Sequence, residues 1–479
     1  MRIKYSNCLV GLTRLKSSLP YLLLLTICCP ASAQQKDHPL NVLFIISDDL
    51  NNSLKCFGNS AVKTPNLDRL ATRGVRFDHA YVQCSLCNPS RVSFLSGLRP
   101  DTTGVHDLVT PTRTYLKDYV FLPQYFRHSG YYSAGIGKVF HTGAGFEDPV
   151  SWDIEIREWG KYPQTNQIAL YGEARGFRDS WEWMKLNISD AETPDGTVAR
   201  KAVEIIEQTR PAEKPFLLGV GFRRPHRPYS APAKYFDLYP PEQIALPDEP
   251  LEHVKSIPLA ALTYDPEKQD MSQAKRREGM AAYYACVSFV DAQVGVLMQA
   301  LDRNHLWDKT VIVFIGDNGY HLGEHGGMWH KESNFEESAR VPLIVVAPGK
   351  KKNAVSPRVV ELVDLYPTAC QLAGLPVPKG LQGTSLVPLL ETPERAWDRP
   401  AFTQIQRKGF MGRSVRTERW RYIEWDEGKK GVHLYDHRRD PSEYVNLAED
   451  PKHADIVKQL QNLLRQARAS VPRPGQPRE

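Results

Sequence analysis

The chain has 479 residues, of which 41% are hydrophobic and 24% are charged. This is the composition of an ordinary globular protein, and the length suits one large domain with a smaller one. Residues 1–33 contain four basic and no acidic side chains, so the remainder carries 57 basic against 55 acidic residues, a net charge of +2 rather than the formal +6. This near balance argues against nucleic acid as a partner.

Residues 1–33 have the pattern of a secretory signal peptide. Basic residues precede an apolar run at 19–28, which is too short to span a bilayer, and the A-x-A sequence at 31–33 is typical of a cleavage site. We therefore expect a secreted or periplasmic protein without stable membrane insertion.

The next part of the chain alternates apolar runs with helical patterns. Short apolar runs that predict buried parallel strands lie at 41–47, 131–137, 215–222, 310–315 and 341–347. Helical patterns lie between them at 66–74, 120–129, 196–209 and 276–303. This alternation predicts an α/β sandwich, in which helices cover both faces of a large, mainly parallel sheet.

Polar residues follow four of these predicted strands. They are Asp48, Asp49, Lys138, His141, Arg224, His226, Asp317 and Asn318. Open α/β sheets bind ligands beyond the carboxyl ends of their strands. We therefore expect these side chains to meet in one site at that edge.

Four of these residues supply oxygen atoms. Asp48, Asp49, Asp317 and Asn318 would form an all-oxygen cluster, which suits Ca²⁺ or Mg²⁺. Adjacent aspartates repel one another unless a cation lies between them. The alternative is a set of capping or salt-bridged carboxylates without a metal.

Residues 87–91 read Cys-Asn-Pro-Ser-Arg. Pro89 suits the first turn of a helix, which would place Cys87 at a helix N-terminus, where an anion is favoured. Arg91 lies four residues on and returns to the same helix face. Cys87 also belongs to an odd set after the leader is removed, with Cys56, Cys84, Cys286 and Cys370, whose pairing stays open. The alternative is a buried structural cysteine before an ordinary helix.

After about residue 395 the pattern changes. Alternating segments at 414–423 and 432–435 predict a small antiparallel sheet, and an amphipathic helix follows near 452–468. We therefore expect a large domain over residues 38–395 and a small C-terminal α+β subdomain over residues 396–479.

The motif at 87–91 resembles the signature of type I sulfatases. Asp48-Asp49, Gly137-Lys138, Arg224-Pro-His226, Asp317-Asn318 and Lys331 also occur in that family's order and rough spacing. Flanking sequence is similar to the iduronate-2-sulfatase branch at 89–103, 137–141, 322–326, 333–335 and 434–447. One departure is Asn318, where that branch can carry histidine.

The resemblance implies an alkaline-phosphatase-like sandwich that hydrolyses sulfate esters. It implies that a maturation enzyme oxidises Cys87 to formylglycine, and that one Ca²⁺ per chain binds Asp48, Asp49, residue 87, Asp317 and Asn318. One hydroxyl of the hydrated aldehyde would attack sulfur, and the second would allow sulfate to leave. A serine or threonine lacks this second hydroxyl.

The same resemblance assigns roles to the basic residues. Lys138, Lys331 and Arg91 would neutralise charge on the sulfate and the diol. His226 or Lys331 would protonate the leaving alcohol, and His141 would take the last proton from the diol. Family members often place the lysine and histidine of this pair one residue apart, whereas Lys138 and His141 are three apart.

Two features bear on the substrate. Segment 151–185 is rich in Trp and Tyr, and its sequence predicts mostly loop. Its aromatic side chains would either stack on sugar rings or pack onto the domain. Three arginines flank His226, namely Arg223, Arg224 and Arg227. They would either recognise a carboxylate or a second sulfate of the substrate, or be charged side chains exposed to solvent. With the branch resemblance, they favour a sulfated anionic oligosaccharide or polysaccharide, with 2-O-sulfated uronate from glycosaminoglycan or algal polysaccharide expected first. The alternatives are a phosphonate or phosphate monoester hydrolase of the same superfamily and a non-catalytic glycan-binding relative.

Three histidines, His321, His325 and His330, lie close together in the sequence. No cysteine or tight histidine spacing accompanies them, so they favour surface or supporting histidines over a zinc site.

Overall fold

The computed structural model describes residues 39–157, 167–173, 181–208, 214–250, 252–263 and 271–469. The predicted signal peptide lies outside these residues. The described chain from Pro39 onward forms one compact unit. The predicted boundary at residue 395 therefore stays a prediction.

Within the described residues the large sheet has eight strands, in the order β11-β2-β10-β9-β1-β7-β3-β4. They are β1 (Asn41–Asp48), β2 (Val75–Tyr81), β3 (Tyr132–Gly137), β4 (Ile154–Ile156), β7 (Phe216–Pro225), β9 (Thr310–Gly316), β10 (Arg340–Val346) and β11 (Ala354–Glu361). Four of the predicted strands, β9, β1, β7 and β3, lie side by side and parallel. Their carboxyl ends therefore meet at one edge, as the sequence predicts.

Strand β10 runs opposite to the prediction. It pairs antiparallel with both β2 and β9. The chain leaves the carboxyl end of β9, passes through residues 317–339 and re-enters the sheet from the same edge, without a crossover to the other edge. An apolar run is the same in either direction, so its composition does not reveal this reversal.

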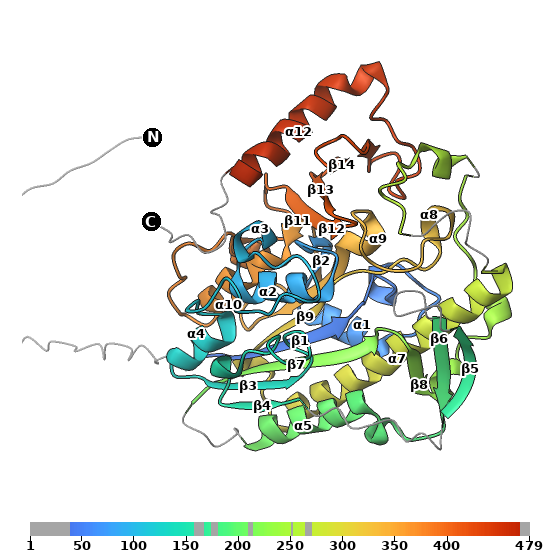
Figure 1. Ribbon diagram of the computed structural model, residues 1–479. Coiled ribbons are helices and arrows are strands. Elements are labelled where there is room, and N and C mark those ends of the chain that lie inside the picture. Colours follow the sequence, from blue (N-terminus) through green and yellow to red (C-terminus); the bar gives the residue numbers. More distant parts are fainter. Residues whose placement is uncertain are drawn as a thin grey trace, which may run out of the picture. The chain divides into compact units, whose positions relative to one another are not determined.

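Helices cover both faces of the sheet (Figure 1). On one face lie α1 (Pro65–Thr72), α5 (Pro194–Gln208) and α7 (Gln273–Arg303), and on the other lie α2 (Cys87–Ser96), α4 (Leu122–His128) and α10 (Leu365–Leu372). Strand β1 faces both layers, since Leu43 and Ile45 enter one core and Val42, Phe44 and Ile46 enter the other. These observations confirm the predicted α/β sandwich. Shorter helices are α3 (Pro100–Thr103), α6 (Ala233–Phe236), α8 (Glu324–Gly327), α9 (Glu336–Ala339) and α11 (Val387–Glu391).

Helix α7 is, among the described residues, the one helix whose length and composition would suit a membrane span. However, 89% of its apolar window is buried inside the protein. We therefore assign it as the central core helix on its face of the sheet.

The C-terminal part is an antiparallel sheet with a helix. Strands β12 (Ala401–Arg407), β13 (Phe410–Arg416), β14 (Trp420–Trp425) and β15 (Val432–Asp436) pair in sequence order. Helix α12 (Ala454–Ala469) packs Leu460 and Leu464 against Val415, Tyr422 and Leu434 of this sheet. This confirms the predicted antiparallel sheet and its helix.

The described residues of segment 151–185 lie mostly in strands, where the sequence predicts loop. The segment contains β4, and β5 (Gln167–Glu173) and β6 (Trp181–Leu186) form a three-stranded sheet with β8 (Tyr229–Pro232). Trp152 and Trp183 are buried in the two cores and do not offer faces to a sugar. Trp159, Tyr162 and the side chains of Tyr171 and Trp181 lie outside the described structure.

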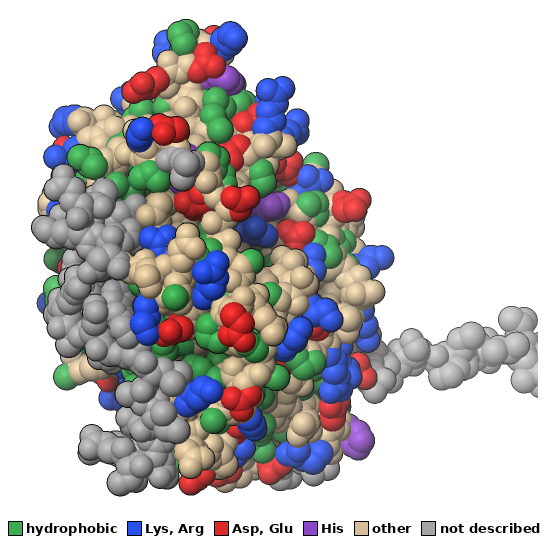
Figure 2. Space-filling view, turned by 90° about the vertical axis from the view of Figure 1, so that its right-hand side faces the viewer, with side chains coloured by type: hydrophobic (Ala, Val, Ile, Leu, Met, Phe, Trp, Pro, Cys, Tyr) green, Lys and Arg blue, Asp and Glu red, His purple; other side chains and the backbone are tan. Residues whose placement is uncertain are grey.

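On the face that Figure 2 presents, Lys and Arg side chains are interspersed with Asp and Glu. Large areas of one sign are absent from the described part of this face, in line with the balanced charge of the sequence. Such a surface gives a polyanion no continuous basic track.

Candidate active site

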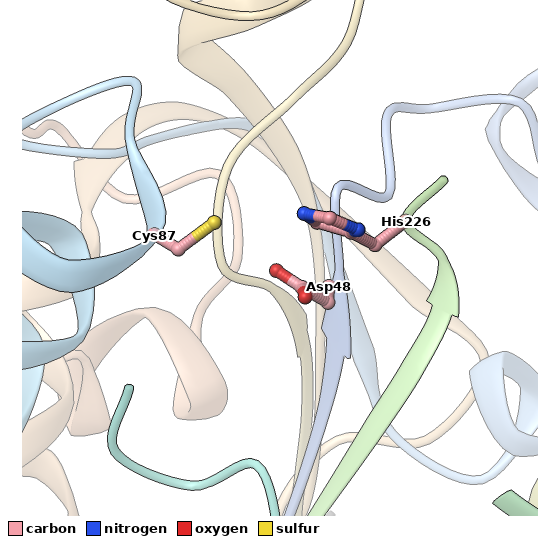
Figure 3. A group of neighbouring side chains, drawn as sticks. All are labelled: Asp48, Cys87 and His226. Atoms are coloured by element: carbon pink, nitrogen blue, oxygen red, sulfur yellow. The ribbon is translucent and has the colours of Figure 1, made fainter. Parts of the chain in front are cut away.

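The candidate site lies where the carboxyl ends of β1, β3, β7 and β9 meet the start of α2. Helix α2 begins at Cys87, directly after the extended residue Leu86, and Pro89 lies in its first turn, as predicted. Cys87, Asp48 and His226 come from α2, β1 and the end of β7, and their side chains face one another (Figure 3). The sheet edge therefore brings together residues far apart in sequence.

Buried carboxylates form the floor of the site. Oxygen atoms of Asp48, Asp49 and Asp317 lie within 4.8 Å of one another, and all three residues are buried. Asn318 donates its Nδ2 to Asp49 Oδ1 at 2.8 Å, which leaves its buried Oδ1 without a hydrogen-bond partner. Asp48 Oδ1 is also buried without a hydrogen bond. Three clustered carboxylates, together with two buried oxygen atoms that accept no hydrogen bond, fit a Ca²⁺ ion.

Three buried cations surround the carboxylates. Lys138 Nζ lies 2.5 Å from Asp48 Oδ2, and Arg91 Nε lies 2.8 Å from Asp317 Oδ2. Lys331 contacts Asp49 Oδ1 and lies 2.6 Å from Cys87 Sγ. Lys331 comes from the segment between β9 and β10. In this arrangement the carboxylates can bind a metal ion and the lysines and arginine can bind an anionic substrate beside it.

The pKa values of the carboxyl groups move in opposite directions. Burial alone would raise the pKa of Asp48, but attraction by Lys138 and other nearby cations lowers it well below its usual range. Burial raises the pKa of Asp317 to about 6, although Arg91 opposes the shift.

Burial, and then repulsion by Asp48, raise the pKa of the Cys87 thiol. The thiol is therefore protonated at neutral pH, and a protonated thiol is a weak nucleophile. All five described cysteines, namely Cys56, Cys84, Cys87, Cys286 and Cys370, are free thiols. The odd cysteine count therefore does not by itself single out Cys87.

Both predicted histidines lie at the site. His226 Nε2 is 3.9 Å from Asp49 Oδ2, its Nδ1 is 2.6 Å from the carbonyl oxygen of Arg227, and burial lowers its pKa to about 4. Burial, followed by repulsion from Lys138, lowers the pKa of His141 to about 3, and its buried Nδ1 has no hydrogen-bond partner. His141 also lines a pocket of about 240 Å³ that includes Arg157. Both imidazoles are neutral at neutral pH.

Arg224 is buried, so it is not the solvated surface charge that was one of the two expectations. It is 1% exposed, and its guanidinium donates to the carbonyl oxygen of His226. Its backbone N–H donates to the buried Asp195 carboxylate at 2.9 Å. Its guanidinium therefore supports the His226 segment, and its expected contact with the substrate stays a prediction. Arg223 is exposed and Arg227 is half-buried.

Tyr283 of α7 is a positioning residue that the sequence did not reveal. Its hydroxyl donates to the carbonyl oxygen of Asp49 at 2.7 Å and accepts from the N–H of Asn51 at 3.0 Å. Asp49 has φ +62°, a left-handed conformation that costs a non-glycine residue on the order of 1–3 kcal/mol. A tyrosine in an apolar helix gives no sign of this role.

We expect Tyr283→Phe to lower the free energy of unfolding by about 1–3 kcal/mol, because it leaves two buried backbone groups unpaired. Chemical denaturation measures this change, and calcium titration should show weaker binding as Asp49 relaxes. The matched control is Tyr284→Phe, whose hydroxyl has a weak 3.4 Å contact with Asn59. Equal stability losses in both variants would contradict the role given to Tyr283.

Comparison with known proteins gives consistent matches. The sulfatase family profile matches residues 40–375, and the profile described as N-sulphoglucosamine sulphohydrolase, C-terminal, matches residues 323–470. A sulfatase of Formosa agariphila is 33% identical over 94% of this chain and 92% of its own length.

Two further relatives resemble the chain. Human iduronate 2-sulfatase is 34% identical over 71% of this chain and 70% of its own length. A solved structure described as a 2-O GAG sulfatase has a TM-score of 0.71 and 25% identity, covering 90% of this chain and 92% of its own.

Proposed function

Because the chain belongs to the sulfatase family, and is therefore a sulfuric ester hydrolase with an alkaline-phosphatase-like fold, we propose that it removes sulfate from anionic glycans with a formylglycine made from Cys87 and one Ca²⁺. The observation that carries this proposal is the position of Cys87. It starts α2, touches Lys331 and faces Asp48 and His226.

Asp48, Asp49, Asp317 and Asn318 would hold the ion together with residue 87. When bound, Ca²⁺ supplies a double positive charge that withdraws electron density from the sulfate ester. Oδ1 of Asp48 and Oδ1 of Asn318 accept no hydrogen bond, which supports this assignment, since buried acceptors rarely remain without one.

Residue 87 supplies the nucleophile after conversion. The hydrated aldehyde carries two hydroxyl groups, of which one attacks sulfur and the other allows sulfate to leave. Cys87 Sγ stands in for one of these oxygens and lies 2.6 Å from Lys331 Nζ. Lys331 is therefore placed to donate a hydrogen bond to an oxygen in this position.

The other basic residues divide into two groups. Lys138 pairs with Asp48 and Lys331 with Asp49, so both are suited to neutralise a sulfate bound at these carboxylates. Arg91 instead pairs with Asp317 and donates to the carbonyl oxygens of Lys138 and Val139. It holds the lysine and a metal ligand in place.

Lys331 and two neutral histidines serve the proton transfers. His226 lies beside Asp49 with a quarter of its side chain exposed, so it can contact the leaving alcohol, but its neutral ring has no acidic proton to give. Charged Lys331 would therefore protonate the alcohol. His141 has an unpartnered ring nitrogen and a depressed pKa, which suit it to accept the last proton from residue 87.

For the substrate we propose a sulfated uronate, with 2-O-sulfate first. The iduronate 2-sulfatase relative and the structural match described as a 2-O GAG sulfatase support this choice. Arg227 is half-buried next to His226. Its positive charge opposes the rise that burial causes in the pKa of Tyr320 and adds to the fall that burial causes in the pKa of His330, so it lies close to both residues beside the site. Of the three arginines it is therefore the best placed to bind a substrate carboxylate. The maturation enzyme would act on the chain before it reaches a secreted or periplasmic location.

We expect Arg227→Ala to raise KM for a 2-O-sulfated uronate disaccharide about 10–100-fold, the loss of one charge-assisted contact of about 1.5–3 kcal/mol. An aryl sulfate has no carboxylate, so its kcat/KM should change little. The assay compares both substrates on matured enzyme, with Arg223→Ala as the exposed control.

A wider panel tests the function itself. It includes 6-O-sulfated amino sugars, algal fragments and choline sulfate. Cleavage of choline sulfate or an aryl sulfate, but of no sulfated glycan, would refute the glycan role. Equal effects of Arg227→Ala on the uronate disaccharide and on the aryl sulfate would refute carboxylate recognition.

A further inference from the structure

A second group of potential ligands lies in the segment between β9 and β10. His321 follows β9, Glu324 and His325 belong to α8, and Glu337 belongs to α9. Ligand atoms of His321, His325 and Glu337 lie within 4.8 Å of one another. The imidazoles are fully buried, which excludes the surface location but not the supporting role among the two expectations from the sequence, and the carboxylates are about one-fifth exposed.

The separations within this group match those around a small ion. His321 Nδ1 is 3.8 Å from Glu324 Oε2 and 3.8 Å from Glu337 Oε2, and His325 Nε2 is 3.1 Å from Glu337 Oε2. Ligands placed about 2.1 Å from a tetrahedral zinc ion lie about 3.4 Å apart. These distances lie on both sides of that value.

His321 supplies an independent indication of a ligand. His321 is 0% exposed. Its Nδ1 has no hydrogen-bond partner, although the carboxylates of Glu324 and Glu337 lie near it. Its other nitrogen, Nε2, lies 2.7 Å from Ser333 Oγ, and this oxygen also accepts from the N–H of Phe335. Metal-bound histidines usually have the second ring nitrogen fixed in this way.

We propose that His321, His325, Glu324 and Glu337 form a second cation site, which binds Zn²⁺ and is separate from the oxygen cluster of Asp48, Asp49, Asp317 and Asn318. Imidazole nitrogens with carboxylates select a first-row metal such as zinc, whereas the oxygen cluster selects a harder cation. Two glutamates balance the charge of one dication. The ion would link the two ends of the segment between β9 and β10. This segment supplies Lys331 to the active site.

Without a cation, the group would have to hold protons instead. Burial, and then the charge of Glu337, raise the pKa of Glu324 to about 8, and His325 would pair with Glu337, whose charge raises the pKa of this imidazole against the effect of burial. Neither protonation gives His321 Nδ1 a partner, whereas a cation satisfies this imidazole and both carboxylates together. The two arrangements predict opposite responses to zinc.

The test uses the purified full chain, stripped with a chelator and reloaded with Ca²⁺. We expect subsequent addition of Zn²⁺ to leave one zinc per chain by elemental analysis after gel filtration, and to raise Tm. Co²⁺ in place of zinc should give the intense visible absorption of a four-coordinate site.

Variants locate the ion. His321→Ala and Glu337→Gln should lose zinc, the zinc-dependent rise in Tm and the cobalt spectrum, while calcium content stays the same. The control is His330→Ala, an imidazole of the same segment outside the group, which should keep all three. Asp317→Asn should keep zinc and lose calcium. Glu337→Gln preserves side-chain volume and decides the result if His321→Ala does not fold.

Three outcomes would overturn the proposal. The first is a wild-type protein that holds no zinc after gel filtration. The second is equal zinc binding by wild type and both variants. The third is a Glu337→Gln variant that is more stable than wild type whether or not zinc is present, because a zinc ligand cannot be removed without losing the stabilisation by zinc.

Discussion

Cys87→Ala is expected to reduce sulfate ester hydrolysis by on the order of 10³-fold or more, because it removes the only atom from which the nucleophile can be made. The thiol is 1% exposed and small, so its removal should change Tm by only a few degrees. Activity on an aryl sulfate and on the preferred glycan should fall together. The loss therefore reports the chemical step and not recognition of the sugar.

The control is Cys84→Ala, which removes a second buried free thiol three residues earlier. Cys84 lacks the proline and arginine that follow Cys87 at two and four positions, so we expect it to stay unmodified and its variant to stay active. Mass spectrometry of the peptide from a host with the maturation enzyme should find the aldehyde or its hydrate at Cys87. An unmodified thiol in an active preparation would disprove the mechanism.

Much of the large sheet was predictable because its central strands are buried on both faces. Strands β1, β3, β7 and β9 are short apolar runs followed by polar residues, and each occurs where predicted. The two edge strands of this sheet were less visible. Strand β11 contains Pro357 and Arg358, and the three residues of β4 are too few for a pattern.

The active site was predictable to the extent that strand ends define it. Asp48, Lys138, His226 and Asp317 meet because four parallel strands end at one edge. Lys331 lies in a loop, and resemblance to the sulfatases alone indicated its role.

The burial of Arg224 could not be predicted from the sequence, because it depends on how the end of β7 packs, where the backbone N–H of Arg224 donates to Asp195 in the first turn of α5. The group of His321, His325 and Glu337 was missed for a related reason. Its last member is twelve residues from His325 in sequence, and only the return of the chain into β10 brings it back.

The second large effect concerns the metal. Asp317 accepts a hydrogen bond from the N–H of Asp49 at 3.0 Å and pairs with Arg91 at 2.8 Å. Alanine at this position would leave Arg91 buried with one partner fewer, at a cost in stability of about 3–5 kcal/mol. Asp317→Asn is therefore the sharper variant, since it keeps the shape and one acceptor oxygen but removes the negative charge.

We expect Asp317→Asn to lose most bound calcium and to lower kcat at least about 100-fold, because a hard dication prefers carboxylate ligands. Elemental analysis and turnover measure the two effects. The matched control is Asp291→Asn, a buried aspartate of α7 that accepts from the N–H of Leu67 at 2.7 Å at the start of α1 and is not a member of the oxygen cluster. It should lose stability but keep calcium. A chelator-treated, calcium-free wild type should be inactive and recover when calcium is restored, whereas full activity without metal would show that the oxygen cluster has another purpose.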